Sequence, residues 1–228
     1  MKEKLKEVFL KYNITISDAK ATDFYLFYRE LIDWNSKINL TSITQEDEVI
    51  VKHFLDSAYP HTLIPTNSKV LDIGAGAGFP SLPLKIMRPD INILMLDSLK
   101  KRVDFLNHMI NVLNLSDIKA THSRIEDLNL KNQFDIVLAR AVAELPTLIE
   151  YGLPFLKTGG LLISYKSLKT DEEIKKSQKA LLILGGKVDN VSRYEIDGNQ
   201  RSIVVIVKVK DSPTKYPRTK NLPKLKPL

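Results

Sequence analysis

The chain has 228 residues, of which 43% are hydrophobic, and it contains no cysteine. This length fits one domain of ordinary size plus an extension, with enough apolar residues for a core. The lack of cysteine excludes disulfides, Cys-ligated zinc and thiolate catalysis, and makes a cytoplasmic location the expectation. The apolar runs are too short for a membrane span, and the first residues lack a secretory h-region. Four scattered histidines predict no metal site.

The net charge of +7 is concentrated near the C-terminus. Residues 208–228 hold seven lysines and arginines against one aspartate, which leaves +1 for the rest of the chain. Four prolines in the same stretch exclude a long helix or a central strand. We therefore predict a basic, Pro-rich tail over residues 211–228, suited to a polyanion or, alternatively, to solubility alone.

Residues 1–60 are predicted to be helical. Apolar residues recur at helical spacing over 5–12 and 24–34, and the chain has no glycine before position 74. Ser17 or Asp18 is a suitable cap for the second helix, and a further short helix is expected over 46–60. The sequence thus predicts an N-terminal helical extension over residues 1–65.

Strands and helices alternate from about residue 68 onward. The expected strands are 69–73, 91–96, 118–122, 134–139, 161–165, 187–194 and 202–209, and the expected helices are 79–88, 101–114, 145–156 and 171–184. Turns are expected at 158–160 and 197–199. This order predicts an α/β, doubly wound, Rossmann-like domain over residues 66–210, mostly parallel with a closing antiparallel hairpin.

The most informative motif is a glycine-rich turn after the first of these strands. It reads Val70-Leu71-Asp72-Ile73-Gly74-Ala75-Gly76-Ala77-Gly78, so glycine occupies three alternate positions. Bare backbone in such a turn lets a nucleotide approach closely. The dinucleotide fingerprint G-x-G-x-x-G would need glycine at position 79, which is Phe. The pattern therefore favours S-adenosylmethionine over NAD, with an ordinary turn as the alternative.

Other strand ends carry groups suited to a nucleoside. Asp97 can accept hydrogen bonds from two ribose hydroxyls, or it can cap the helix that follows. Arg140 follows an apolar strand, where a charge needs a partner, so we expect it to face ligand or substrate. In the loop 123–127 an apolar side chain can cover an adenine ring, and a backbone N–H or carboxylate can read its edge.

Missing residues narrow the class of methyl acceptor. Methylation of C5 in pyrimidines usually needs a Cys nucleophile, which this chain lacks. The D/N-P-P-Y/F loop that usually holds exocyclic base amines is replaced by Ala139-Arg140-Ala141-Val142-Ala143. Ring nitrogens and hydroxyls remain. Guanine N7 has a lone pair and no proton, so alignment with the sulfonium methyl can supply most of the catalysis without a general base.

Several segments of the chain carry a family resemblance, and they are Trp34–Thr41, His53–Ser57, Asp72–Pro80, Asp97–Arg102, Ser123–Glu126, Ala139–Ala141, Tyr165-Lys166, Arg201–Ile206 and Lys215–Arg218. Together they resemble the GidB (RsmG) family of bacterial 16S ribosomal RNA guanine-N7 methyltransferases. Their order and spacing are specific, and the resemblance spans nearly the whole chain. The chain departs from the family pattern at Ser81 and Ser167, where the family commonly has glycine.

The resemblance implies an enzyme that uses S-adenosylmethionine, releases S-adenosyl-L-homocysteine and methylates one guanosine of 16S RNA in the 30S subunit. A cytoplasmic monomer with no membrane partner is expected. With the motifs, it predicts cofactor contacts from Asp72, Gly74, Gly76, Gly78, Phe79, Asp97, Ile125, Glu126 and Arg140. It places Asn39, His53, Arg124, Lys166 and Arg201 on the RNA side or in support of the site's shape. Arg140 is the expected catalytic residue, through orientation.

Three other functions share parts of this pattern. A small-molecule or protein methyltransferase shares the cofactor motifs without needing a basic tail. An NAD-linked short-chain dehydrogenase needs Tyr-x-x-x-Lys on a helix, and Tyr216 and Lys220 have this spacing, but Pro217 argues against a helix there. A non-catalytic RNA-binding module would bind RNA and not the cofactor. Under the methyltransferase hypothesis, removing the residues after about 210 should weaken RNA binding and spare cofactor binding.

Overall fold

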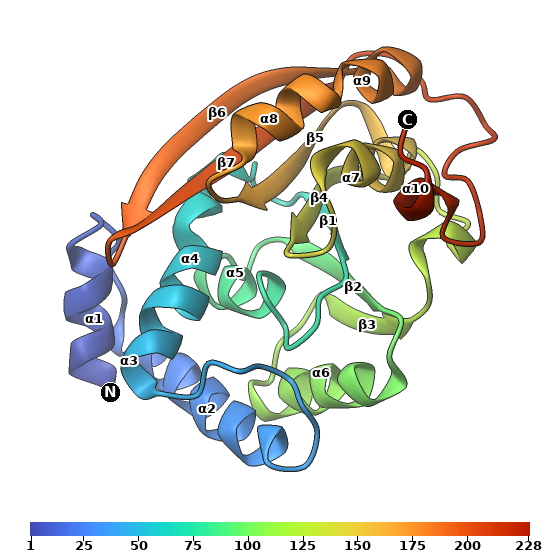
Figure 1. The fold of residues 1–228 in the computed structure, drawn as a ribbon. Helices are drawn as coiled ribbons and strands as arrows, with labels where there is room; N and C mark the ends of the chain where they lie inside the picture. Colours follow the sequence, from blue (N-terminus) through green and yellow to red (C-terminus); the bar gives the residue numbers. More distant parts are fainter. The chain divides into compact units, whose positions relative to one another are not determined.

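A computed structural model describes all residues from 1 to 228 (Figure 1). Its seven strands have the order β3-β2-β1-β4-β5-β7-β6, mostly parallel with an antiparallel hairpin, which confirms the predicted fold class. Contacts divide the chain into two units. Unit 1 comprises Met1–Asn67 and Ala75–His122, and unit 2 comprises Ser68–Gly74 and Ser123–Leu228. None of the helices combines the length and apolar character needed to cross a bilayer.

The N-terminal part of unit 1 is helical, as predicted. Its elements are α1 (Lys2–Leu10), α2 (Asp18–Asn35), α3 (Glu46–Glu48), a π-helical segment (Val49–Leu55), α4 (Asp56–Ala58) and a 3-10 turn (Tyr59–Leu63). Ser17 caps α2 by accepting a hydrogen bond from the Lys20 backbone N–H at 3.4 Å, which confirms the predicted cap. Fully buried phenylalanines at 9, 24, 27 and 54 form its core.

The remainder of unit 1 supplies two strands and two helices. The strand β2 (Asn92–Asp97) pairs in parallel with β3 (Ile118–His122). Two helices complete the unit, α5 (Ser81–Met87) and α6 (Lys100–Val112), and α2 packs against both. The N-terminal helices therefore share a unit with part of the α/β domain. The predicted division into residues 1–65, 66–210 and 211–228 follows patterns along the sequence rather than contacts in space, and it stays a prediction.

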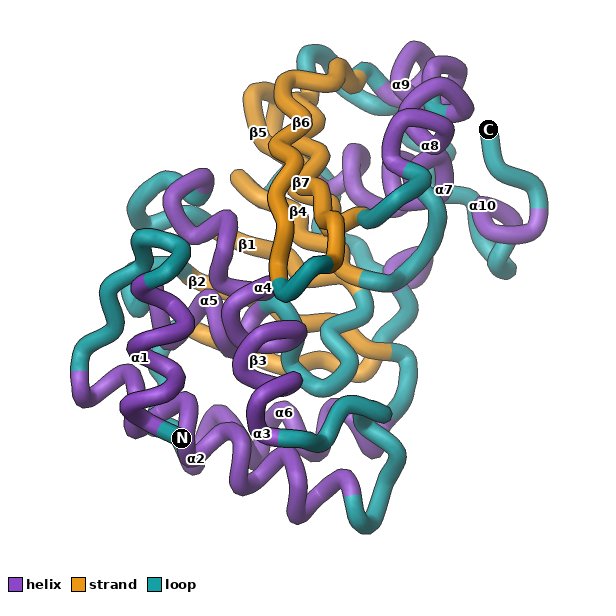
Figure 2. Tube along the Cα trace, turned by 60° about the vertical axis from the view of Figure 1, so that its left-hand side comes forward, coloured by secondary structure: helices purple, strands orange, loops and turns teal.

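Unit 2 holds the other five strands. They are β1 (Lys69–Ile73), β4 (Phe134–Arg140), β5 (Leu156–Lys166), β6 (Gly186–Ile196) and β7 (Asn199–Lys208). The first three run parallel, and the β6–β7 hairpin adds to β5 in antiparallel fashion (Figure 2). Positive φ angles at Asp197 and Gly198 (+51° and +70°) form the predicted hairpin turn.

Four helices belong to unit 2. They are α7 (Leu145–Gly152), α8 (Thr170–Lys176), α9 (Gln178–Leu184) and α10 (Leu222–Leu225). The single helix predicted over 171–184 is wrong, because the chain breaks into α8 and α9 at Ser177, whose hydroxyl donates to the Glu173 carbonyl at 2.7 Å. The C-terminal residues fold against α7 through α10 and bury Tyr216, Pro217 and Pro223.

The turn predicted at 158–160 is also wrong, because β5 starts at Leu156 and runs through these residues. The pairing register of β4 and β5 shifts between Phe134, which pairs with Leu156, and Ile136, which pairs with Leu161. The extra residues of β5 form a bulge at this point. Glycine is required at position 160 because a Cβ would lie 2.9 Å from the carbonyl oxygen of Asp135. Gly160 thus marks a close approach of neighbouring strands, whereas Gly159 serves through its φ of +86°.

Candidate functional site

The predicted glycine turn is present after β1. Gly74, Gly76 and Gly78 have φ angles of +71°, +58° and +88°, a region that favours glycine. The N–H groups of Gly78 and Phe79 both donate to the Ala75 carbonyl, at 2.8 and 3.0 Å. A Cβ on Gly78 would lie 2.3 Å from Leu82 Cδ1, so this position also lacks room for a side chain. At Gly78, sterics and backbone conformation therefore both require glycine.

Asp97, at the end of β2, fastens this turn. Its side chain is 3% exposed, and Oδ2 accepts the Gly76 N–H at 2.9 Å. The other oxygen, Oδ1, accepts the Leu99 N–H at 2.9 Å, and an Arg102 nitrogen lies 3.6 Å from Oδ2. A carboxylate offers about four lone-pair positions, so each oxygen can accept one further hydroxyl. Asp97 therefore orders the turn and still has the capacity expected for ribose.

The aromatic ring of Phe79 packs among the N-terminal helices. It stacks on His53, with ring centroids 4.3 Å apart, and on Phe27 at 5.3 Å. His53 Nε2 lies 2.8 Å from the Thr41 hydroxyl. The amide oxygen of Asn35 accepts the N–H groups of Leu40 and Thr41, at 2.8 and 2.9 Å. The segments around Asn35 and His53 thus support the glycine turn from the side of the N-terminal helices.

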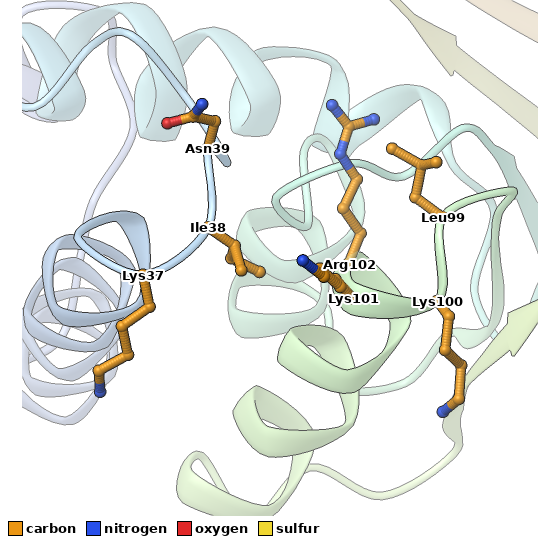
Figure 3. A pocket seen from close by; sticks show the side chains of 7 residues that line it. All are labelled: Lys37, Ile38, Asn39, Leu99, Lys100, Lys101 and Arg102. Atoms are coloured by element: carbon orange, nitrogen blue, oxygen red, sulfur yellow. The ribbon is translucent and has the colours of Figure 1, made fainter.

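A basic cleft of about 450 Å³ separates residues 37–39 from the start of α6 (Figure 3). Its lining contains no acidic residue and consists of Lys37, Ile38, Asn39, Leu99, Lys100, Lys101 and Arg102. Figure 3 shows Lys37 and Lys100 pointing away from it, and they pair with Asp33 and Asp104. Lys101 is exposed and has no acidic partner in the structure, and Leu99 is 53% exposed. Of this lining, only Asn39 was predicted from the sequence as a site residue. The basic run at 100–102 is the sequence feature that could have indicated the cleft.

The cofactor residues predicted in unit 2 lie on and after β1 and β4. Asp72 is fully buried in β1, beside Leu138 of β4. A Cβ on Gly74 would lie 3.0 Å from the Val142 side chain, so the loop after β4 passes close to this glycine. Arg140 ends β4 and is half-buried. The next residue, Ala141, has φ of +56°, a strained conformation that turns the chain sharply.

Lys166 lies inside the protein, with its side chain 8% exposed. Its ammonium group is 2.7 Å from the Glu173 carboxylate and donates to the Ala143 carbonyl at 2.8 Å. Glu173 also accepts the Leu145 N–H at 2.7 Å. This pair therefore fixes the loop that follows Arg140. Lys166 sits where it can shape the site, which is one of the two roles that the resemblance allowed.

The loop 123–127 holds two other predicted cofactor residues. Ile125 is buried, and Glu126 accepts a hydrogen bond from the Tyr151 hydroxyl at 3.4 Å. Burial, and then the charge of Glu126, raise the pKa of Tyr151 to about 12, so this hydroxyl keeps its proton at neutral pH. Arg124 is exposed and donates to the Asn221 amide oxygen at 2.9 Å.

Arg201 lies on β7 next to Ser202, which pairs with Lys166 of β5. It lines a shallow cleft of about 380 Å³ beside the start of α8 and the β6–β7 hairpin. One guanidinium nitrogen donates to the Gln200 carbonyl at 3.2 Å. The cleft contains both basic and acidic side chains, in contrast to the cleft at Lys101.

The ion pair between Glu150 of α7 and Arg218 was not predicted from the sequence. The Glu150 carboxylate has no exposed surface and accepts three hydrogen bonds from Arg218, at 2.6 to 2.9 Å. The sequence feature that could have indicated this pair is the single carboxylate within the apolar stretch 145–155, because a buried charge needs a partner.

The GidB family, described as rRNA small subunit methyltransferase G, matches residues 20–204. A relative named ribosomal RNA small subunit methyltransferase G, from Desulforamulus reducens, is 44% identical over 98% of this chain and 97% of its own length. Relatives of the same name from Streptococcus agalactiae and Staphylococcus aureus are 43% and 41% identical, over 97% and 99% of this chain and 97% and 98% of their own lengths.

Solved structures share the fold at low identity. M. jannaschii TYW2 in complex with AdoMet has a TM-score of 0.56 and 16% identity, over 73% of this chain and 77% of that one. A SAM-dependent O-methyltransferase from Thermotoga maritima has a TM-score of 0.56 and 14% identity, over 80% and 72%. Because the family match covers most of the chain and the relatives cover nearly all of it, the chain belongs to the GidB family of rRNA small subunit methyltransferases.

Proposed function

We propose that this protein transfers a methyl group from S-adenosylmethionine to N7 of one guanosine in 16S ribosomal RNA. The observation that carries the proposal is the family membership over nearly the full length. Relatives that share more than 40% identity are named as methyltransferases of the small-subunit RNA. The absence of a C5-type Cys nucleophile and of an amine-binding Pro-Pro loop supports a ring nitrogen as acceptor.

The proposed cofactor residues fit S-adenosylmethionine chemically. They are Asp72, Gly74, Gly76, Gly78, Phe79, Asp97, Ile125, Glu126 and Arg140. The glycines leave backbone accessible, Asp97 keeps acceptor capacity on both oxygens, and the buried Ile125 is an apolar surface suited to adenine. When bound, S-adenosylmethionine supplies an electrophilic methyl group on a positively charged sulfur.

The chain's own residues would act by orientation. Guanine N7 attacks through a lone pair and releases no proton, so no residue has to serve as general base. The guanidinium of Arg140 has N–H donors and no acceptor, so it is suited to hold an electron-rich base edge or a phosphate rather than to accept a proton. The Lys166–Glu173 pair fixes the loop after Arg140 and so supports its orientation. Alignment of this kind can supply several orders of magnitude in rate.

The basic cleft at Asn39 supports RNA binding on unit 1. Lys101 and Arg102 are suited to phosphate, and the apolar Ile38 and Leu99 are suited to a base. On unit 2, Lys215, Lys220, Lys224 and Lys226 of the C-terminal segment are exposed. We place Asn39, His53, Arg124 and Arg201 among the residues that contact the RNA or support the shape of its binding site. We further propose that the enzyme acts as a monomer in the cytoplasm, where small ribosomal subunits are its substrate.

The proposal is tested with radiolabelled S-adenosylmethionine and small subunits from a strain that lacks this protein. The expected result is label recovered as 7-methylguanosine at one position of the 16S RNA. Parallel reactions with naked 16S RNA show which form is the substrate. Label recovered only in protein or small molecules, with cofactor binding intact, would reject the RNA acceptor.

A further inference from the structure

The C-terminal tail, residues 211–228, is anchored to unit 2 by several specific contacts. The Ser212 hydroxyl donates to the Leu184 carbonyl at 2.7 Å, and Lys131 donates to the Thr214 carbonyl at 2.6 Å. The Thr147 hydroxyl of α7 donates to the Pro223 carbonyl at 3.1 Å in a buried position. The tail is therefore a packed part of unit 2.

The strongest anchor is Arg218. Its backbone N–H and Nε donate to one Glu150 oxygen, at 2.9 and 2.8 Å, and Nη2 donates to the other at 2.6 Å. The same Nη2 donates to the Lys226 carbonyl at 2.9 Å, which closes the tail on itself. The Glu150 contacts hold the pKa of Arg218 above its ordinary value, so the guanidinium stays charged. The donors of Arg218 are therefore largely occupied by partners within the protein, although its side chain is 21% exposed.

Two contacts lead from this anchor to the loop 123–127. Tyr151 follows Glu150 on α7, and its hydroxyl donates to Glu126. Asn221, three residues after Arg218, accepts a hydrogen bond from Arg124 at 2.9 Å. Asn221 holds a left-handed φ of +57°, a conformation that asparagine tolerates better than most residues. The tail thus reaches the loop directly at Arg124 and through α7 at Glu126.

We propose that residues 216–223 are a positioning clamp for the loop 123–127, and that Asn221 and Arg218 thereby set the affinity for the cofactor. This inference rests on the proposed function, because it uses the assignment of Ile125 and Glu126 to S-adenosylmethionine. A loop that is held before binding loses less conformational freedom on binding, so its anchors strengthen affinity without touching the ligand. The tail then serves the cofactor side of the reaction as well as any RNA contact of its lysines.

The matched test uses two neighbouring residues in the same backbone conformation. Asn221→Gly removes the amide oxygen that accepts the hydrogen bond from Arg124, and glycine adopts a φ of +57° without steric cost. Lys220→Gly is the control, because Lys220 has φ of +59° and no polar partner in the structure. In calorimetric titrations of S-adenosylmethionine without RNA, we expect Asn221→Gly to raise Kd about three- to fivefold and Lys220→Gly to leave it unchanged.

Three readouts separate positioning from general loss of structure. The KM for S-adenosylmethionine should rise in Asn221→Gly while kcat at saturating cofactor stays the same. Hydrogen exchange should quicken at the Asp127 and Leu128 amides, which bond within this loop. Arg218→Gln should raise Kd about tenfold, and Arg218→Lys should recover part of the affinity by keeping the charge.

The outcomes distinguish the clamp from the function on which it rests. If the unaltered protein binds no S-adenosylmethionine, the proposed function and the clamp both fail. If it binds normally and Asn221→Gly and folded Arg218→Gln bind equally well, only the clamp fails. Equal weakening by Asn221→Gly and Lys220→Gly would also overturn it, since the Arg124 contact would then be irrelevant. Should Arg218→Gln fail to fold, the Asn221 and Lys220 variants still decide the question.

Discussion

Arg218 donates three hydrogen bonds to the fully buried carboxylate of Glu150, a residue 68 positions earlier in the sequence. Removing one partner of a buried ion pair leaves an uncompensated charge, which costs roughly 3–5 kcal/mol. Arg218 is 21% exposed, so the lower end of this range applies. This pair makes the tail a structural element and changes what truncation should do.

We therefore expect truncation after Lys210 to lower the free energy of unfolding by about 3 kcal/mol or more, in addition to weakening RNA binding. The sequence alone suggested that cofactor binding would be spared. Urea unfolding of the truncated and full chains measures the difference. Adding Glu150→Gln to the truncated chain should recover part of the loss, because the buried charge is then gone. Equal stability of the full and truncated chains would show that Glu150 needs no partner.

Gly78→Ala should abolish measurable cofactor binding and lower stability by roughly 2–4 kcal/mol, because it combines a φ of +88° with a clash at Leu82. Gly159→Ala is the matched control. Its φ is +86°, but nothing lies within 4 Å of the added Cβ, so a loss of about 1 kcal/mol is expected. Thermal unfolding and cofactor titration test both. Similar behaviour of the two variants would show that the close approach to Leu82 is unimportant.

Lys101→Gln should weaken RNA binding several-fold and reduce the slope of log affinity against log salt by about 1, if its ammonium group contacts one phosphate. Lys100→Gln is the comparison, because Lys100 points away from the cleft and pairs with Asp104 (Figure 3). Filter binding over a range of salt concentrations measures both slopes. A slope change in Lys100→Gln instead of Lys101→Gln would place the RNA backbone outside the cleft.

Arg140→Ala should lower methyl transfer about a hundredfold, the scale expected when reacting groups lose their alignment. The protein should remain folded, because Arg140 ends its strand at a half-buried position. Single-turnover transfer rates and circular dichroism provide the two measurements. Full activity in the variant would remove Arg140 from the reaction.

The Arg88–Asp90 pair in unit 1 gives a pH-dependent prediction. The Arg88 guanidinium, together with the Asn67 N–H, holds the pKa of Asp90 well below its usual value. A depressed carboxyl pKa stabilises the fold above the unfolded pKa near 4, and this contribution disappears as pH falls. Asp90→Asn should therefore destabilise the protein at pH 7 and less so at pH 3. Urea unfolding at both values measures this; an equal loss at both would refute the ionic origin.

Local sequence signals were sufficient for much of the fold. The strands at 69–73 and 118–122 match their predicted bounds, and the glycine turn lies where the alternating glycines placed it. In these segments the local conformation is determined by an apolar run or by a requirement for positive φ, and both can be read from a few neighbouring residues. The close partner of Gly160, the Asp135 carbonyl, comes from another strand, so the local pattern was misread as a turn.

Long-range partners explain the rest of the site. Lys166 was recognised by resemblance, but its pairing with Glu173 and the Ala143 carbonyl depends on how α8 and the loop after β4 pack. The Glu150–Arg218 pair likewise joins an apolar helix to a distant tail. Composition indicated that the tail is basic. Tertiary packing, however, determines which of its lysines and arginines point inward.

The same ion pair has a consequence for the order of events during synthesis. Chains emerge from the ribosome N-terminus first, and Arg218 is made long after Glu150. Until then α7 carries a carboxylate that has no partner, so unit 2 cannot reach its final packing while these residues are still being translated. Unit 2 of this enzyme, whose relatives are named for modifying ribosomal RNA, would thus complete its packing only after Arg218 has left the ribosome.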